Sequence, residues 1–185
     1  VLTLYVIEEP DISSPADTVL PVAWQIQFSY PQGYRDCEAV AVDSAGETLY
    51  LISKRTIPAE VWTLPIAPTS DVLQPTRVAT LRYIPQPRQI DRRQDPANWR
   101  FRATPTGLDF AGDTAVVTTY ADAFVFERQA GHSWAATFSG MPRRLQLPAM
   151  SGREAVAFFN NGRSLLLVAE RFGTVASTPV FQVDL

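Results

Sequence analysis

Three segments of the sequence resemble one another and superpose without gaps over about their first dozen residues. They begin at Glu38, Thr106 and Glu154. Each predicts a strand of small residues, a tight polar turn and a strand of bulkier residues, followed by a third strand that contains aromatic side chains. The spacing between the three starts is near the period of a β-propeller blade. Small residues suit an innermost strand near a central axis, and bulkier residues suit the outer strands.

The rest of the chain also favours an all-β fold. Fifteen prolines and nine glycines interrupt it, and no long stretch shows the apolar periodicity of a helix. Short β-branched and aromatic runs between turn signals are typical of a sandwich, a barrel or a propeller, and the repeat favours the propeller. Besides the strand that starts at Thr106, the predicted strands are Leu2–Ile7, Ala23–Tyr30, Ala39–Val42, Thr48–Ser53, Glu60–Ile66, Arg77–Ile84, Thr114–Tyr120, Ala123–Glu127, Ala155–Phe159, Ser164–Ala169 and Pro179–Val183.

The strand count predicts one propeller-type domain with about three four-stranded blades, an arc of a larger ring. Residues 1–30 are expected to be the outer strands of a preceding blade, and residues 31–84 and 99–149 the two full blades. Residues 150–185 form an incomplete blade. An isolated arc would expose apolar blade faces, so we expect either a longer polypeptide or a second chain that completes the structure.

Composition excludes several classes of protein. Hydrophobic residues make up 46% of the chain, which argues against disorder, and the net charge of −3 gives no general attraction to nucleic acid or an anionic membrane. One cysteine, Cys37, excludes an internal disulfide and a cysteine-cluster zinc site. Its acidic neighbours should raise the pKa of the thiol, and we expect a small buried residue. No apolar run approaches the ~18 residues that span a bilayer, so we expect no direct membrane insertion.

The stretches Tyr30–Val40, Thr106–Asp109 and Ser151–Val156 resemble a signature in bacterial propeller proteins related to the group named for the esterase-like activity of phytase. That group belongs to a wider set of proteins with about six or seven blades, which includes gluconolactonase-like folds. The resemblance covers roughly residues 30–170 and implies the fold much more than a reaction. It also implies a periplasmic or extracellular location. The second segment has Thr106 where the others have Glu38 and Glu154, so a ring of acidic residues would be interrupted.

Four carboxylates are the candidate metal ligands: Asp36, Glu38, Asp109 and Glu154. If the repeats are blades, Glu38 and Glu154 occupy equivalent positions near one mouth of the central channel. Converging carboxylates there can hold a hard cation such as Ca²⁺ or perform acid–base chemistry. The alternative is that they cap turns, accept backbone hydrogen bonds or lie in solvent. No cofactor is expected apart from this Ca²⁺.

An arginine-rich stretch over residues 82–102 contains the insertion predicted for residues 85–98. Its guanidinium groups can bind an anionic group or the acidic patch of a protein partner, and the alternative is a solvated loop. Nucleic acid is a weaker candidate because the whole chain is acidic. The candidate partner-binding residues are Arg88, Arg92, Arg93, Trp99 and Arg100.

Residues Gly131–Ala135 nearly match the Gly-x-Ser-x-Gly nucleophile elbow. That elbow needs a strand that turns sharply into a helix, and we expect a loop or hairpin turn with no helix after it. His132 is the only histidine, so no serine–histidine–acid triad can be assigned.

Two classes of function remain. We favour a non-catalytic propeller module that binds or scaffolds proteins, in which the partner is another protein or the missing part of the same ring. The alternative is a metal-assisted, hydrolase-like propeller that acts on an ester, lactone or phosphoester at the acidic channel mouth.

Overall fold

The computed structural model describes residues 1–10, 19–94, 96, 99–148, 152–170 and 178–185. The fold is all-β, as predicted, and contains two short helices. In the described part of the chain, no helix has both the length and the apolar composition to cross a membrane. The strands are β1 Leu2–Ile7, β2 Val22–Phe28, β3 Cys37–Asp43, β4 Thr48–Ser53, β5 Glu60–Pro65, β6 Thr76–Thr80, β7 Pro105–Ala111, β8 Thr114–Thr119, β9 Asp122–Glu127, β10 Arg143–Gln146, β11 Arg153–Phe159, β12 Ser164–Ala169 and β13 Val180–Asp184.

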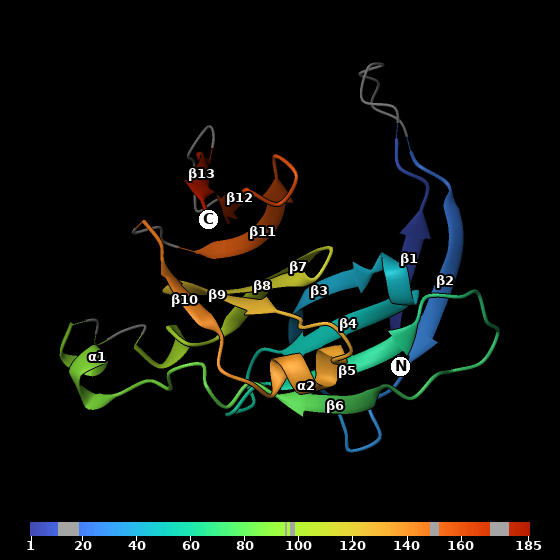
Figure 1. Cartoon of the computed structure of the whole chain (residues 1–185). Coiled ribbons are helices and arrows are strands. Elements are labelled where there is room, and N and C mark those ends of the chain that lie inside the picture. Colours follow the sequence, from blue (N-terminus) through green and yellow to red (C-terminus); the bar gives the residue numbers. More distant parts are fainter. Residues whose placement is uncertain (11–18, 95, 97–98, 149–151, 171–177) are drawn as a thin grey trace.

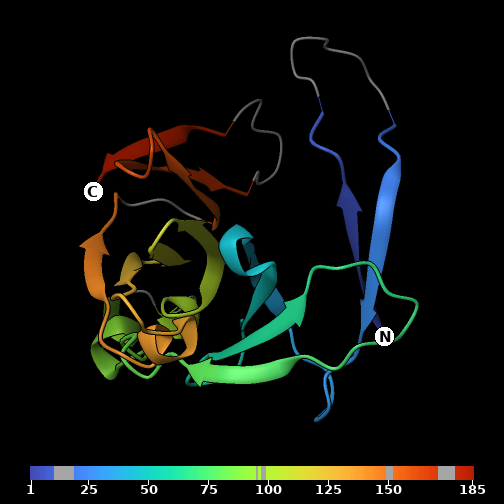
Figure 2. The same ribbon diagram turned by 45° about the vertical axis from the view of Figure 1, so that its right-hand side comes forward.

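The strands form four antiparallel sheets that follow the order of the chain: β1-β2, β3-β4-β5-β6, β7-β8-β9-β10 and β11-β12-β13. Every strand within a sheet is paired with its neighbour in sequence. The first strands of the last three sheets lie beside one another, β3 against β7 and β7 against β11. The sheets therefore fan out from these three strands, as Figures 1 and 2 show.

The second strand of each full sheet is buried on both faces. In β4, Leu49 and Leu51 pack toward the β1-β2 sheet, whereas Tyr50 and Ile52 pack toward the β7-β10 sheet. In β8, the side chain of Val116 packs toward the β11-β13 sheet. A strand with sheets on both sides needs a continuous apolar run, and the sequences of β4 and β8 provide one. Three apolar cores, one between each pair of neighbouring sheets, thus hold the molecule together.

The three adjacent first strands approach one another closely. A Cβ atom added at Gly107 in β7 would lie 2.7 Å from Oγ1 of Thr118 and 3.0 Å from Cγ1 of Val156 in β11. Because any side chain at this position would overlap its neighbours, glycine permits the close approach of the β11 strand.

The helix α2, Trp134–Phe138, connects β9 to β10 and contacts β6 and β9. Trp134 is buried, and its indole Nε1 donates a hydrogen bond of 3.0 Å to Oδ2 of Asp43 at the end of β3. The guanidinium group of Arg128 lies 4.6 Å from the centre of the Trp134 ring and 3.8 Å from the same carboxylate. This buried group joins two neighbouring sheets at the end of the strands opposite Glu38.

The β1-β2 hairpin is joined to the next sheet by the segment between β5 and β6. Ser29 N donates to the carbonyl oxygen of Leu73 at 2.9 Å, and Leu73 N donates to the carbonyl oxygen of Gln27 at 2.8 Å. Nε1 of Trp24 in β2 donates to the carbonyl oxygen of Ile66 at 3.0 Å. Main-chain bonds therefore extend the contact between these sheets beyond their apolar core.

Two of the strands differ from the sequence-based expectation. The strand predicted over Arg77–Ile84 ends at Thr80, after which the chain turns. β10 was not predicted, because its sequence contains two arginines and a glutamine and its side chains are mostly exposed. It is a strand because it pairs with β9 along the edge of the sheet.

We predict that Trp134→Phe lowers the free energy of unfolding by about 2 kcal/mol, because it removes a buried hydrogen bond to a carboxylate. Urea unfolding followed by circular dichroism measures this change. Trp99→Phe is the matched control, since Trp99 is half-buried in the β6–β7 connection and should tolerate the change. If both variants lower the free energy of unfolding by the same amount, the hydrogen bond from Trp134 to Asp43 makes no special contribution to stability.

Candidate functional site

The first strands of the last three sheets share an irregularity at their beginning. The register shifts between Cys37 and Ala39 in β3, between Pro105 and Gly107 in β7 and between Arg153 and Ala155 in β11. The extra residues at these three bulges are Glu38, Thr106 and Glu154, the starts of the three aligned segments. A bulge redirects the side chain of its extra residue. The structure thus presents the aligned positions at one end of three adjacent strands.

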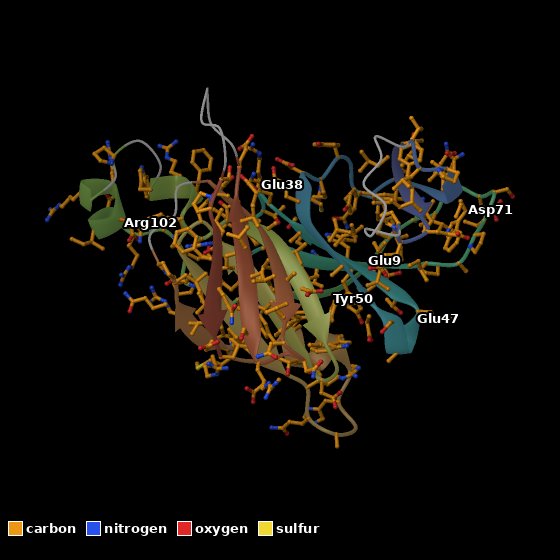
Figure 3. All side chains as sticks on the ribbon, turned by 90° about the horizontal axis from the view of Figure 1, so that it is seen from above. Glu9, Glu38, Glu47, Tyr50, Asp71 and Arg102 are labelled. Atoms are coloured by element: carbon orange, nitrogen blue, oxygen red, sulfur yellow. The ribbon has the colours of Figure 1, made fainter. Side chains whose placement is uncertain are left out.

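A polar network connects two of these bulges. Nζ of Lys54, the first residue after β4, bonds to Oε2 of Glu38 and donates to the hydroxyl of Tyr120 at 3.0 Å. Tyr120, the first residue after β8, donates to Oε1 of Glu154 at 2.6 Å. Glu38 lies at the end of the β3–β4 hairpin opposite Glu47, as Figure 3 shows. This Lys54 network joins the last three sheets through charged and polar side chains.

The network changes the proton affinity of its members. Burial raises the pKa of Glu154, and the nearby Glu38 carboxylate raises it further, against the effect of Tyr120 and Lys54. Burial alone would lower the pKa of Lys54, but its hydrogen bonds to Glu38 and Tyr120 raise it. Burial and the bond to Glu154 raise the pKa of Tyr120. At neutral pH Lys54 therefore remains an ammonium group, which is a hydrogen-bond donor and not a nucleophile.

The other two predicted metal ligands lie in different interactions. Asp36 forms a salt bridge of 2.6 Å with Arg55. Oδ2 of Asp109 accepts a hydrogen bond of 2.6 Å from the main-chain N–H of Phe158, between β7 and β11. Among the described residues, no group of three or more histidine, cysteine, aspartate or glutamate side chains is placed to share a metal ion. The structure thus brings Glu38 and Glu154 into one network and separates Asp36 and Asp109 from it.

Thr106 breaks the acidic series for a physical reason. Its side chain is completely buried, and its hydroxyl has no hydrogen-bond partner among the described residues. β7 lies between β3 and β11, so its bulge is covered from both sides. A carboxylate at this position would be removed from water, which is costly unless a cation pairs with it.

The arginine-rich connection between β6 and β7 lies at the same end of the sheets as Glu38. The helix α1, Gln89–Gln94, occupies part of the insertion that the sequence predicted for residues 85–98. Among the described residues of this connection, Asp91 accepts a 2.7 Å hydrogen bond from the main-chain N–H of Arg88 and lies 3.8 Å from Arg102. Arg92, Arg93 and Arg100 are exposed. Figure 1 shows α1 outside the sheets.

The apparent nucleophile elbow is a helix cap. Contrary to expectation, a helix follows Ser133, because α2 begins at Trp134. The hydroxyl of Ser133 accepts a hydrogen bond of 3.2 Å from Ala136 N, which is the role of an N-cap. No strand runs directly into this helix, since β9 ends at Glu127. Six residues, 128–133, separate β9 from α2. The Gly131–Ala135 segment therefore resembles the nucleophile elbow in sequence but lacks its strand-to-helix geometry.

The pKa of Cys37 is raised, as the sequence predicted, but the residue is only partly buried and burial contributes more to the shift than its acidic neighbour. Its thiol lies 2.9 Å from the hydroxyl of Tyr30 and is half-buried. Burial, together with the Asp36 carboxylate, raises the pKa of Cys37 to about 11. The thiol therefore stays protonated and unreactive at neutral pH.

Lys54 and Tyr120 are the members of the network that the sequence interpretation missed. Both follow the second strand of their sheet, so they occupy equivalent places in two of the aligned segments. Lys54 is also the only lysine in the chain. Lys54 directly follows the predicted strand Thr48–Ser53, but Tyr120 falls inside the predicted strand Thr114–Tyr120, so a comparison of the predicted strand ends would have missed it.

Comparisons with known proteins show weak structural likeness. No family model and no curated protein sequence matches the chain. Similar solved structures include a luciferin-regenerating enzyme, with a TM-score of 0.48, 11% identity, and coverage of 80% of this chain and 45% of that one. Another is the hydrazine synthase of Kuenenia stuttgartiensis, with a TM-score of 0.47, 17% identity, and coverage of 89% and 37%. The chain spans less than half the length of each.

We predict that Tyr120→Phe lowers the free energy of unfolding by about 1–2 kcal/mol, because Glu154 loses its donor and Lys54 loses an acceptor. Urea unfolding measures this effect. The control is Tyr83→Phe, because the Tyr83 side chain is 51% exposed. An unchanged free energy in Tyr120→Phe would contradict the role of the network in joining the sheets.

Two glutamates should give the stability opposite dependences on pH. The pKa of Glu154 is raised, so its stabilising contribution is present below the ordinary glutamate pKa of about 4.3 and is lost as the pH rises through the folded value. Burial alone would raise the pKa of Glu60, but hydrogen bonds from Arg35 and Arg77 lower it. The contribution of Glu60 is therefore present above the ordinary pKa and is lost as the pH falls through the folded value.

Glu154→Gln should therefore become more stable relative to the wild type as the pH rises, and Glu60→Gln should become less stable. Urea unfolding over a pH series measures both differences. If the difference in the free energy of unfolding from the wild type changes with pH in the same direction for both variants, the assigned directions of the two pKa shifts are wrong.

Proposed function

We propose that the chain is a segment of a β-propeller and acts as a non-catalytic module that binds protein through its uncovered sheet. The order of the sheets supports the propeller, because three antiparallel meanders fan out from adjacent first strands and a two-stranded sheet packs outside the first of them. In this proposal, β3-β6 and β7-β10 are full blades. The sheets β1-β2 and β11-β13 are parts of two more, and the ring continues beyond both.

The composition of β12 carries the proposal. Leu165 and Leu167 pack in the core shared with the β7-β10 sheet. Leu166 and Val168 alternate with them, so they face the other side of the sheet, where no neighbouring sheet lies among the described residues. β12 thus has the continuous apolar run that β4 and β8 need because they are buried on both faces. A strand of this composition suits a position between two sheets.

The uncovered face is apolar over β11 and the adjoining part of β12, and it ends in a polar group of Ser164, Gln182 and Asp184. Its other apolar members come from the neighbouring strands and are exposed: Ala155, Ala157, Phe159 and Val180. Contiguous apolar surface of this kind marks a protein interface in a soluble protein. The surface repeats the arrangement of the existing junctions, where one meander packs face to face on the next. The occupant we propose is therefore a further antiparallel sheet, from the same polypeptide or from a second chain.

The geometry of the Lys54 network favours this module over the hydrolase-like alternative. The positive charge next to Glu38 and Glu154 comes from the protein itself, in the ammonium group of Lys54. A Ca²⁺ ion at these carboxylates would have to displace or approach that ammonium group, at a cost in repulsion. The extracytoplasmic location that the resemblance implies stays a prediction.

A charge placed on the uncovered face tests the proposal. We expect Val180→Glu, in the protein as isolated from its source, to lower the melting temperature by several degrees or to reduce the native mass. Val180 is 61% exposed in this chain, so the substitution costs little unless another sheet covers it. Differential scanning calorimetry and light scattering after size-exclusion chromatography provide the two readouts.

The matched control is Val19→Glu, because Val19 is 95% exposed and lies outside the sheets. It should leave both the melting temperature and the mass unchanged. If Val180→Glu also leaves both unchanged, nothing covers this face and the proposal fails.

A further inference from the structure

The connection between β6 and β7 differs in charge from the rest of the protein. The chain carries a net charge of −3, yet residues 82–102 contain six arginines and only two aspartates. Arg88 and Arg102 both lie within 4 Å of Asp91, which offsets part of this charge. Arg102 and Glu38 lie toward the same end of the strands (Figure 3). A cationic surface is therefore concentrated beside the Lys54 network.

A small pocket opens between this connection and the turn after β4. Lys54 and Arg100 supply its two charged side chains, both cationic, and no acidic residue lines it. Thr56, Gln86 and Thr104 add polar groups, and Leu81 and Ile84 form part of an apolar wall. Lys54 uses two of its three N–H donors in the network, on Glu38 and Tyr120. Because the charge of Lys54 is already shared with Glu38 and Glu154, Arg100 supplies most of the positive charge that is available to a small anionic group here, and the remaining N–H of Lys54 adds a donor.

The guanidinium group of Arg100 is held in position for such a group. Its Cζ lies 5.4 Å from the centre of the Trp99 ring, a cation–π contact. Arg100 is exposed, and its planar donors remain available for a carboxylate with two oxygens. Stacking on the half-buried Trp99 limits its rotamers, which lowers the entropy lost on binding.

The surface around the pocket suits a peptide. Arg92 and Arg93 are exposed in the last turn of α1. Ile90 and Phe101, on either side of them in the chain, are 45% and 42% exposed. Arginine and aromatic side chains are enriched where proteins bind one another. An acidic segment with an apolar residue would match both features.

We propose that an acidic peptide segment of a partner protein binds here, with one carboxylate in the pocket between Lys54 and Arg100 and further carboxylates on Arg92 and Arg93. This rests on the proposed protein-binding function and names the chemistry of the partner. A polynucleotide fits less well, because it would extend from this patch onto the acidic remainder of the protein.

Fluorescence anisotropy with two labelled peptides tests the proposal. One peptide is rich in aspartate and glutamate and contains one phenylalanine; the other has the corresponding amides. We expect only the acidic peptide to bind, with an affinity that falls as the salt concentration rises. Arg100→Ala should weaken binding about tenfold, and so should the pair Arg92→Ala with Arg93→Ala.

The control removes equal charge elsewhere: Arg143→Ala with Arg163→Ala, both exposed and outside the connection. Binding should be unchanged in this variant. Equal weakening by the control, equal binding of the amide peptide, or tighter binding of a single-stranded oligonucleotide would each overturn the proposal. Any of these results alongside a positive Val180→Glu test would refute the acidic partner and leave the protein-binding module standing.

Discussion

The side-by-side packing of β3, β7 and β11 is the constraint on which the other features depend. Strands this close can carry only small side chains where they touch, and Gly107 shows the limit, because a single added carbon would meet both Thr118 and Val156. The same closeness makes each sheet diverge outward, so larger side chains are needed farther from these strands. It also brings the three bulges to one end, and there the polar residues gather.

The Lys54 network and the Asp43–Trp134 bond perform related tasks at opposite ends of these strands. Apolar cores hold neighbouring sheets together but are poorly directional. Hydrogen bonds between charged and polar groups define which residue of one sheet faces which residue of the next. Lys54 reaches Glu38 within its own sheet and Tyr120 in the neighbouring one, and Tyr120 continues to Glu154 in the third. The residues of the candidate site thus also hold the last three sheets in position relative to one another.

Much of the fold was predictable, and the exceptions have physical causes. β4 and β12 have the predicted bounds, Thr48–Ser53 and Ser164–Ala169, because apolar runs between turn signals are a local property. β10 and α2 were not predicted, since pairing with β9 and packing of Trp134 on Asp43 depend on residues far away in sequence. For the site, the repeat placed Glu38 and Glu154 together. It did not reveal their partners, because the alignment ended before Lys54 and Tyr120.

The contact of Leu73 with β2 has a consequence for how this sequence can vary. Both bonds use main-chain atoms, from Ser29 to Leu73 and from Leu73 to Gln27. Position 73 therefore needs an amide hydrogen as well as an apolar side chain, because Leu73 also packs against the core between these sheets. Among substitutions, proline is the one that removes a main-chain bond outright. In homologous chains these main-chain bonds can therefore persist while the residue at position 73 changes from one apolar residue to another. A comparison based on residue identity would not detect them.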